Sequence, residues 1–220
     1  MSVEKPVITP KNASDRTREI CRLAPVIPVL VVNSVDTAAD LARALVAGGL
    51  PALEVTLRTE AALDAIREMA RTEGGVVGAG TLLTPQDVHS AVLAGAVFGV
   101  SPGATDRLLD AAEEAGLPML PGAATAGEAM RLLERGYGVQ KFFPAEANGG
   151  TAALKALAAP LPQISFCPTG GVTPGNAASY LSLPNTLCVG GSWVAPAAMV
   201  EAGDWPGITA LASDAAALPR

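Results

Sequence analysis

The chain has 220 residues, of which 50% are hydrophobic and 16% are charged, a composition that suits a large buried core and excludes a disordered chain. A net charge of −6 leaves no basic patch for nucleic acid or a membrane, although an anionic metabolite can still bind backbone N–H groups and a few arginines. Three cysteines without CxxC spacing predict free thiols, and a single histidine argues against a histidine-based metal site. The sequence has no apolar leader and no membrane-length apolar run, which predicts a cytoplasmic protein.

The predicted elements alternate regularly along the chain. Residues 1–12 are expected to form a flexible tail. A helix over roughly Asp15–Leu23 is expected to precede the first strand and to plug the bottom of a barrel. Short apolar or β-branched runs then predict eight strands. These strands are Val26–Val32, Ala52–Leu57, Val76–Leu82, Val97–Ser101, Pro118–Gly122, Val139–Phe143, Ile164–Cys167 and Thr186–Val189.

Helical segments follow the predicted strands. Thr37–Val46, Glu60–Arg71 and Pro85–Leu93 carry apolar residues at i, i+3 and i+4 spacing, and glycines stand where the helices should end. Repeated strand, helix and glycine predict an α/β fold with a parallel sheet, and eight strands are the number that closes a (β/α)8 TIM barrel. A doubly wound open sheet is the alternative. No linker interrupts the pattern, so residues 13–220 are predicted to form a single catalytic domain.

Polar residues share one face of the second predicted strand. Leu53, Val55 and Leu57 suit packing under helices, so the alternate residues should point into the barrel. Glu54 then lies deep, and Arg58 lies near the mouth at the carboxyl end of the strand, where barrel enzymes carry their active sites. A purely structural ion pair is the alternative, because a buried charge needs a partner but need not do chemistry.

One lysine lies inside a predicted strand. Lys141 shares a face with Val139 and Phe143, and burial against helices would be a poor environment for its ammonium group. We therefore expect Lys141 to point into the same cavity as Glu54. A neutral lysine amine is a nucleophile toward carbonyl carbons, and a nearby carboxylate can move the protons that imine chemistry requires. A lysine that pairs with Glu54 for stability alone is the alternative.

Paired glycines end the last two predicted strands. Thr169–Gly171 follows the seventh strand, and Gly190–Ser192 follows the eighth. Loops at these two places commonly bind phosphate in (β/α)8 barrels, because glycines let backbone N–H groups approach the anion. Glycines that serve only tight turns are the alternative.

Small residues also lie at the ends of the third and fourth predicted strands. Thr81 comes directly after a glycine-rich run, and Pro102 comes after the fourth strand. Both leave room for a ligand, and Thr81 would offer its hydroxyl to a carboxylate. Thr81 could instead cap the next helix, but Thr84 fits that role better because Pro85 then occupies the first helical position.

Six short segments occur in a consistent order from about Pro25 to the last predicted strand. They are "LEVTLRT" (53–59), "GAGT" (78–81), "SPG" (101–103), "KFFPAEANGG" (141–150), "FCPTGG" (166–171) and "GGSW" (190–193). Together they resemble the family of 2-keto-3-deoxy-6-phosphogluconate (KDPG) and 4-hydroxy-2-oxoglutarate aldolases. The resemblance implies a class I aldolase on a (β/α)8 barrel, without metal or cofactor, commonly assembled as a homotrimer.

The resemblance also implies a role for individual residues. Lys141 would be the Schiff-base lysine and Glu54 the general acid/base. Three further groups would contact the substrate. They are Arg58 and Thr81 for the carboxylate, Phe143, Pro102 and Thr169 for the pyruvyl pocket, and Gly170, Gly171, Gly191 and Ser192 for the phosphate.

The reaction that the resemblance implies is cleavage of KDPG to pyruvate and D-glyceraldehyde 3-phosphate, in the Entner–Doudoroff pathway. Aldolases for the 6-phosphogalactonate epimer or for 4-hydroxy-2-oxoglutarate are the alternatives within the family, because segments around the fourth and fifth strands depart from its pattern. A phosphate-binding barrel isomerase or synthase without imine chemistry is a more distant alternative.

Overall fold

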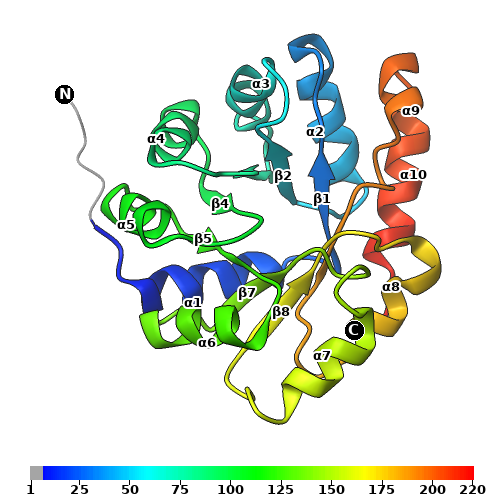
Figure 1. Ribbon diagram of the computed structural model, residues 1–220. Coiled ribbons are helices and arrows are strands. Elements are labelled where there is room, and N and C mark those ends of the chain that lie inside the picture. The colour runs from blue at the N-terminus through cyan, green and yellow to red at the C-terminus, as the bar shows by residue number, and fades with distance from the viewer. Residues whose placement is uncertain (1–6) are drawn as a thin grey trace.

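The computed structural model describes residues 7–220 and has an α/β fold, in which parallel strands curl into a barrel surrounded by helices (Figure 1). The strands agree closely with the apolar runs in the sequence. They are β1 Val26–Leu30, β2 Ala52–Thr56, β3 Val76–Gly80, β4 Phe98–Val100, β5 Met119–Leu120, β6 Gly122–Ala123, β7 Val139–Phe142, β8 Ser165–Pro168 and β9 Val189–Gly191.

The nine strands occupy eight positions around the barrel, because β5 and β6 are two parts of the predicted fifth strand. One sheet has the order β5-β4-β3-β2-β1-β9, and the other has the order β6-β7-β8. Pro121 separates β5 from β6, because proline has no N–H to donate to a neighbouring strand. Its carbonyl still accepts a hydrogen bond from the Lys141 N–H at 2.9 Å. β5 therefore pairs with β4, and β6 pairs with β7.

The opposite seam closes between β8 and the segment that leads into β9. Isolated bridges join Phe166 to Thr186 and Thr169 to Gly190. The predicted eighth strand at Thr186–Val189 is displaced, because this stretch pairs first with β8 and only Val189–Gly191 pairs with β1. With both seams joined, the (β/α)8 barrel predicted from the sequence is confirmed, and the open-sheet alternative is excluded.

Helices connect the strands on the outside of the barrel (Figure 1). Thr84 caps its helix through a reciprocal pair of hydrogen bonds with Asp87, as expected from the Thr-Pro sequence. Gly95 and Gly136 end two helices in the left-handed conformation. The helices are α1 Pro10–Cys21, η1 Val35–Thr37, α2 Ala38–Ala47, α3 Ala62–Met69, α4 Pro85–Ala94, α5 Asp106–Glu114, α6 Ala126–Arg135, α7 Gly150–Ala158, α8 Pro174–Leu181, α9 Ala197–Ala202 and α10 Trp205–Ala216.

Helix α1 begins earlier than the sequence suggested. It starts at Pro10, with Thr9 as its N-cap, so residues 10–12 belong to a helix and not to a flexible tail. Pro10 at the first turn favours this start because its fixed φ suits a helix and it needs no hydrogen-bond acceptor there. Residues 1–6 of the predicted tail lie outside the described residues, and the assignment of residues 13–220 to one domain stays a prediction.

Helix α1 closes the amino-terminal end of the barrel, as the sequence predicted. The Ser14 hydroxyl accepts the N–H groups of Gly138 and Val139, both at 3.0 Å. The Thr17 hydroxyl donates to the Met119 carbonyl at 3.1 Å. These partners lie where β7 and β5 begin, and Figure 1 shows α1 running beside these strands. Among residues 7–220, α1 thus covers the amino-terminal end of the barrel and leaves the carboxyl ends of the strands as the side from which a ligand can enter.

The lower interior of the barrel is apolar. Its buried side chains come from α1 and from the inward faces of the strands. They are Cys21, Ile27, Ala52, Phe98, Val100, Leu120, Val139, Cys167 and Cys188. All three cysteines are free, and hydrogen bonding of the Cys188 thiol to Cys167 and Cys21, followed by burial, raises the pKa of Cys188. Within residues 7–220, no helix is long and apolar enough to cross a membrane.

Ser14→Ala should destabilise the fold by about 1–3 kcal/mol, because two buried backbone N–H groups lose their acceptor. Urea unfolding would measure the change. Ser213→Ala on the exposed side of α10 is the matched control, and it should change stability by less than about 0.5 kcal/mol. Equal midpoints for the two variants would show that α1 does not depend on this contact.

Candidate active site

A buried ion pair crosses the barrel above its apolar floor. Lys141 extends from β7 and Glu54 from β2, and the lysine Nζ donates to Glu54 Oε1 at 3.2 Å. Their side chains are only 6% and 3% exposed. Both point into the barrel, as the alternation of the two strands predicts. An amine and a carboxylate thus lie within proton-transfer distance in a space that excludes most water.

Gly80 makes room for the Glu54 carboxylate. It ends β3, and a Cβ atom at this position would lie 2.3 Å from Glu54 Oε1. Any other residue would force the carboxylate to move. The sequence suggested that small residues here leave space for a ligand, whereas the structure shows that the space at Gly80 is filled by a side chain of the site itself.

Phe143 lies between the amine and the glycine loop that follows β8. Lys141 Nζ is 5.3 Å from the centre of its ring, within the range of a cation–π contact. A Cβ atom at Gly170 would lie 3.3 Å from the same ring. The Phe143–Pro144 peptide bond is cis. Phe143 therefore forms one wall of the space beside Lys141.

Arg58 and Thr81 lie together at the barrel mouth. Arg58 Nε donates to Thr81 Oγ1 at 3.2 Å. Thr81 has a φ of 60°, a left-handed conformation that is uncommon for a β-branched residue and that is often found at functional sites. Arg58 is exposed and forms no salt bridge with any residue in 7–220. Its guanidinium is therefore free to bind an external carboxylate.

Pro102 and Thr169 occupy other edges of the same mouth. Pro102 follows β4, and its carbonyl lies close to Gly122. A Cβ atom added at Gly122 would lie 2.2 Å from the Pro102 carbonyl oxygen. Gly122 is in register with Lys141, so Pro102 borders the strand next to the amine. Thr169 is 6% exposed and bridges β8 to Gly190 at the seam of the barrel.

The Gly170–Gly171 loop presents unused backbone donors. The two glycines have φ values of 97° and 78°, which glycine adopts readily. Their carbonyls accept from the Glu146 N–H and from the Asn176 side-chain amide, both at 3.1 Å. Their own N–H groups donate to no acceptor in the described part of the chain. Helix α8 begins just beyond them at Pro174, so its dipole also favours an anion here.

The second glycine pair, Gly190–Gly191, differs from the first in which groups of its loop can donate hydrogen bonds. A Cβ atom at Gly191 would lie 1.9 Å from the Trp193 ring, so this glycine is needed for tryptophan packing. Ser192 is exposed, and its hydroxyl has no hydrogen-bond partner within residues 7–220. The backbone N–H groups of Ser192 and Trp193 also lack an acceptor among those residues. The donors of this loop are therefore the serine and the backbone that follows it.

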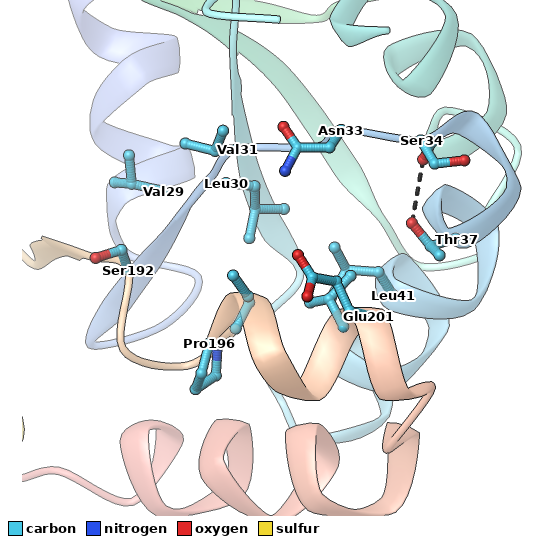
Figure 2. A pocket seen from close by; sticks show the side chains of 13 residues that line it. Val29, Leu30, Val31, Asn33, Ser34, Thr37, Leu41, Ser192, Pro196 and Glu201 are labelled. Carbon is cyan, nitrogen blue, oxygen red and sulfur yellow. Dashed lines mark hydrogen bonds between the residues drawn. The ribbon is translucent and has the colours of Figure 1, made fainter.

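A separate hollow of about 330 Å³ adjoins Ser192 (Figure 2). It lies between the carboxyl end of β1 and α9, and Figure 2 shows Glu201 reaching into it from α9. Asn33 and Thr37 add polar groups to walls that are otherwise largely apolar. Neither Lys141 nor Glu54 lines this hollow, so it is distinct from the space around the ion pair.

The predicted site residues thus gather at one end of the barrel. An amine and a carboxylate lie at the centre, a free guanidinium at one edge, and two loops with unused N–H donors at another. The described residues include no group of three His, Cys, Asp or Glu side chains placed to hold a metal ion. This arrangement suits a carbonyl compound that carries negative charges at both ends.

Comparison with known proteins identifies relatives over nearly the whole chain. A family model described as "Aldolase: KDPG and KHG aldolase" matches residues 17–211. A 2-dehydro-3-deoxy-phosphogluconate aldolase from Pseudoalteromonas atlantica is 50% identical over 208 residues, which cover 94% of this chain and 97% of the relative.

Solved structures agree with this match. The 2-keto-3-deoxy-6-phosphogluconate aldolase of Zymomonas mobilis, in a structure with 3-phosphoglycerate, is 49% identical with a TM-score of 0.89, covering 94% of this chain and 98% of that one. The KDPG aldolase from Legionella pneumophila, with pyruvate captured as a covalent carbinolamine, is 44% identical with a TM-score of 0.88, covering 91% and 98%. The extent and the identity of these matches show that the chain belongs to the KDPG and KHG aldolase family.

Proposed function

We propose that this protein is a class I aldolase that cleaves KDPG to pyruvate and D-glyceraldehyde 3-phosphate through a Schiff base on Lys141. The observation that carries the proposal is the 3.2 Å hydrogen bond between Lys141 Nζ and Glu54 Oε1 inside the barrel. Family membership supports it, and so does the carbinolamine captured in the Legionella pneumophila relative. The reaction belongs to the Entner–Doudoroff pathway.

Formation of the imine uses the two buried groups together. The neutral Lys141 amine attacks the C2 carbonyl carbon, and the carbonyl electrons move to oxygen, which gives a carbinolamine. Glu54 is protonated when the Lys141 ammonium becomes the neutral amine, and it gives this proton to the C2 alkoxide that the attack forms. Glu54 then takes a second proton from the attacking nitrogen and passes it to the C2 hydroxyl, which leaves as water. The product is an iminium ion, which withdraws electrons from C3. Glu54 can make these transfers because its carboxylate already contacts the amine.

Cleavage and release follow from the iminium. A base removes the proton of the C4 hydroxyl, the C3–C4 bond breaks, and C4 becomes the aldehyde carbon of glyceraldehyde 3-phosphate. The electrons of the broken bond move toward the iminium nitrogen and form an enamine. Protonation of C3 gives the imine of pyruvate, and water then hydrolyses it and frees Lys141. Glu54 is the proton carrier that serves these steps.

The remaining residues would orient the substrate. Arg58, with Thr81 beside it, would bind the C1 carboxylate, because a guanidinium can form two parallel hydrogen bonds with it. The pyruvyl group would lie between walls formed by Phe143, Pro102 and Thr169. The phosphate would bind the two glycine loops, through Gly170, Gly171, Gly191 and Ser192.

4-Hydroxy-2-oxoglutarate is a second candidate substrate, and the name of the matching family supports it. It shares the pyruvyl half of KDPG and carries a carboxylate in place of the phosphate-bearing chain. The same loop donors would accept that carboxylate. The protein is further proposed to act as a homotrimer, as the family resemblance implies, and light scattering on the purified protein would test the assembly. A cytoplasmic location is proposed from the lack of an apolar leader or membrane-length run in the sequence.

Borohydride reduction in the presence of pyruvate should attach a stable pyruvyl group to Lys141, because borohydride reduces an imine to an amine. Peptide mass mapping would locate it. Lys141→Ala should lose both the adduct and pyruvate release, while Lys155→Ala, at an exposed position on α7, should retain both. Absence of an adduct, or an adduct on another lysine, would favour the isomerase or synthase alternative.

Glu54→Gln should still form some imine with pyruvate but should lower kcat about 100- to 10,000-fold, since the amide cannot carry protons. A lactate dehydrogenase-coupled assay of pyruvate release would measure kcat. Glu114→Gln, at an exposed position on α5, is the matched control and should keep the normal rate. Normal turnover by the Glu54 variant would assign proton transfer to another group.

Gly80→Ala should lower kcat about 100-fold, because the added methyl group displaces the Glu54 carboxylate from the amine. Gly127→Ala is the matched control, since a Cβ atom at this helical position meets nothing within 4 Å. The same coupled assay applies. Equal rates for the two variants would contradict the proposed dependence on carboxylate position.

A further inference from the structure

A buried tyrosine contacts a carboxylate outside the catalytic centre. Tyr180 lies on α8 and is 0% exposed, and its hydroxyl donates to Glu146 Oε1. Glu146 lies in the segment between β7 and α7, close to the Gly170–Gly171 loop. Burial, followed by the hydrogen bond to Glu146, raises the pKa of Tyr180, so the hydroxyl remains a proton donor. The proposed reaction uses neither residue.

Glu146 supports both glycines of the loop. Its backbone N–H donates to the Gly170 carbonyl at 3.1 Å. Its side-chain stem lies against Gly171, where a Cβ atom would be 2.6 Å from Glu146 Cγ. The neighbouring N–H of Ala145 donates to the Thr169 carbonyl at 2.8 Å, which extends the contact by one residue. The segment after β7 therefore holds the backbone of residues 169–171 from one side.

Gly150 leaves space for the tyrosine–glutamate hydrogen bond. A Cβ atom at this position would lie 3.2 Å from the Tyr180 hydroxyl and 3.3 Å from Glu146 Oε1. Gly150 is the first residue of α7 and has a φ of 57°. The hydrogen bond thus joins the segment between β7 and α7 to α8, beside the first residue of α7.

These contacts determine which groups of the loop remain available. The Glu146 N–H and the Asn176 side-chain amide each donate to one glycine carbonyl, whereas the two glycine N–H groups donate to no acceptor within residues 7–220. A phosphate binds such donors well only if they are held in place beforehand. A freely moving Glu146 carboxylate would also repel a phosphate at short range, and the Tyr180 hydroxyl restrains it.

We infer that Glu146 and Tyr180 are positioning residues, which hold the Gly170–Gly171 loop in the conformation that binds the substrate phosphate. The assignment of that loop to the phosphate rests on the proposed function. The pair contacts neither Lys141 nor Glu54, so it should affect the phosphate-bearing end of the substrate without changing imine chemistry at the pyruvyl end.

The test compares binding of glycerol 3-phosphate with pyruvate chemistry in the full chain. Calorimetry gives the Kd of glycerol 3-phosphate, which carries a phosphate but no ketone. Exchange of the pyruvate methyl protons in D₂O, followed by NMR, reports imine and enamine formation without a phosphate. Tyr180→Phe should weaken glycerol 3-phosphate binding about fivefold and raise KM for KDPG similarly, as expected for one lost hydrogen bond. Exchange and kcat should stay unchanged.

Tyr137→Phe is the matched control. Tyr137 is also 0% exposed and also donates to a glutamate, Glu113, at 3.0 Å, but it lies just before β7 at the other end of the barrel. It should leave the Kd of glycerol 3-phosphate unchanged. Glu146→Ala should weaken binding at least as much as Tyr180→Phe, because it removes the stem that supports Gly171 as well as the acceptor.

Other outcomes would decide against the inference. Unchanged glycerol 3-phosphate binding in Tyr180→Phe, or no binding by the unmodified protein, would overturn it. An equal loss of pyruvate exchange in Tyr180→Phe would show a general structural role and would also overturn it. Absence of exchange in the unmodified protein would refute the proposed aldolase activity instead, and calorimetry would still decide whether the pair supports an anion site.

Discussion

The ion pair between Lys141 and Glu54 is the interaction on which the site depends. Both groups are almost fully buried, and removing two charges from water costs several kcal/mol that their attraction need not recover. Such a pair is weak evidence for stability, so its retention inside the barrel points to chemistry. Its surroundings are arranged to keep the two groups in contact, with Gly80 making room for the carboxylate and Phe143 lying beside the amine.

The closed barrel makes this contact possible. Glu54 and Lys141 are 87 residues apart in the chain and lie on strands that do not pair with each other, so only the closure of the sheet brings them together. Helix α1 and the buried cysteines fill the interior below, which leaves access from the carboxyl ends of the strands. The mouth carries the exposed Arg58 and the N–H groups of the glycine loops, which meet no acceptor among residues 7–220. A negatively charged substrate can thus be held at its ends while its carbonyl reaches the buried amine.

The side of the barrel mouth that is proposed to bind the phosphate requires support because it consists of loops. Glycines lose more conformational freedom on ordering than other residues, so a loop built on Gly170 and Gly171 gains from contacts that fix its carbonyls. Glu146 provides one such contact, Asn176 provides another, and Tyr180 holds Glu146 in turn. The Lys141–Glu54 pair is held by strands, whereas the loop proposed to bind phosphate is held by side chains from neighbouring segments.

The sequence by itself determined the periodic βα order, the inward faces of β2 and β7, and the gathering of the candidate residues at one end, because side-chain alternation and glycine positions are local properties. It misplaced the start of α1 and the last strand, where pairing partners and helix packing decide the boundaries. Only the tertiary structure decided that Gly80 makes room for Glu54, that Gly191 makes room for Trp193 and that Tyr180 holds Glu146. Each of these is a contact across strands or loops, whose distance depends on how the barrel closes and not on the spacing of residues along the chain.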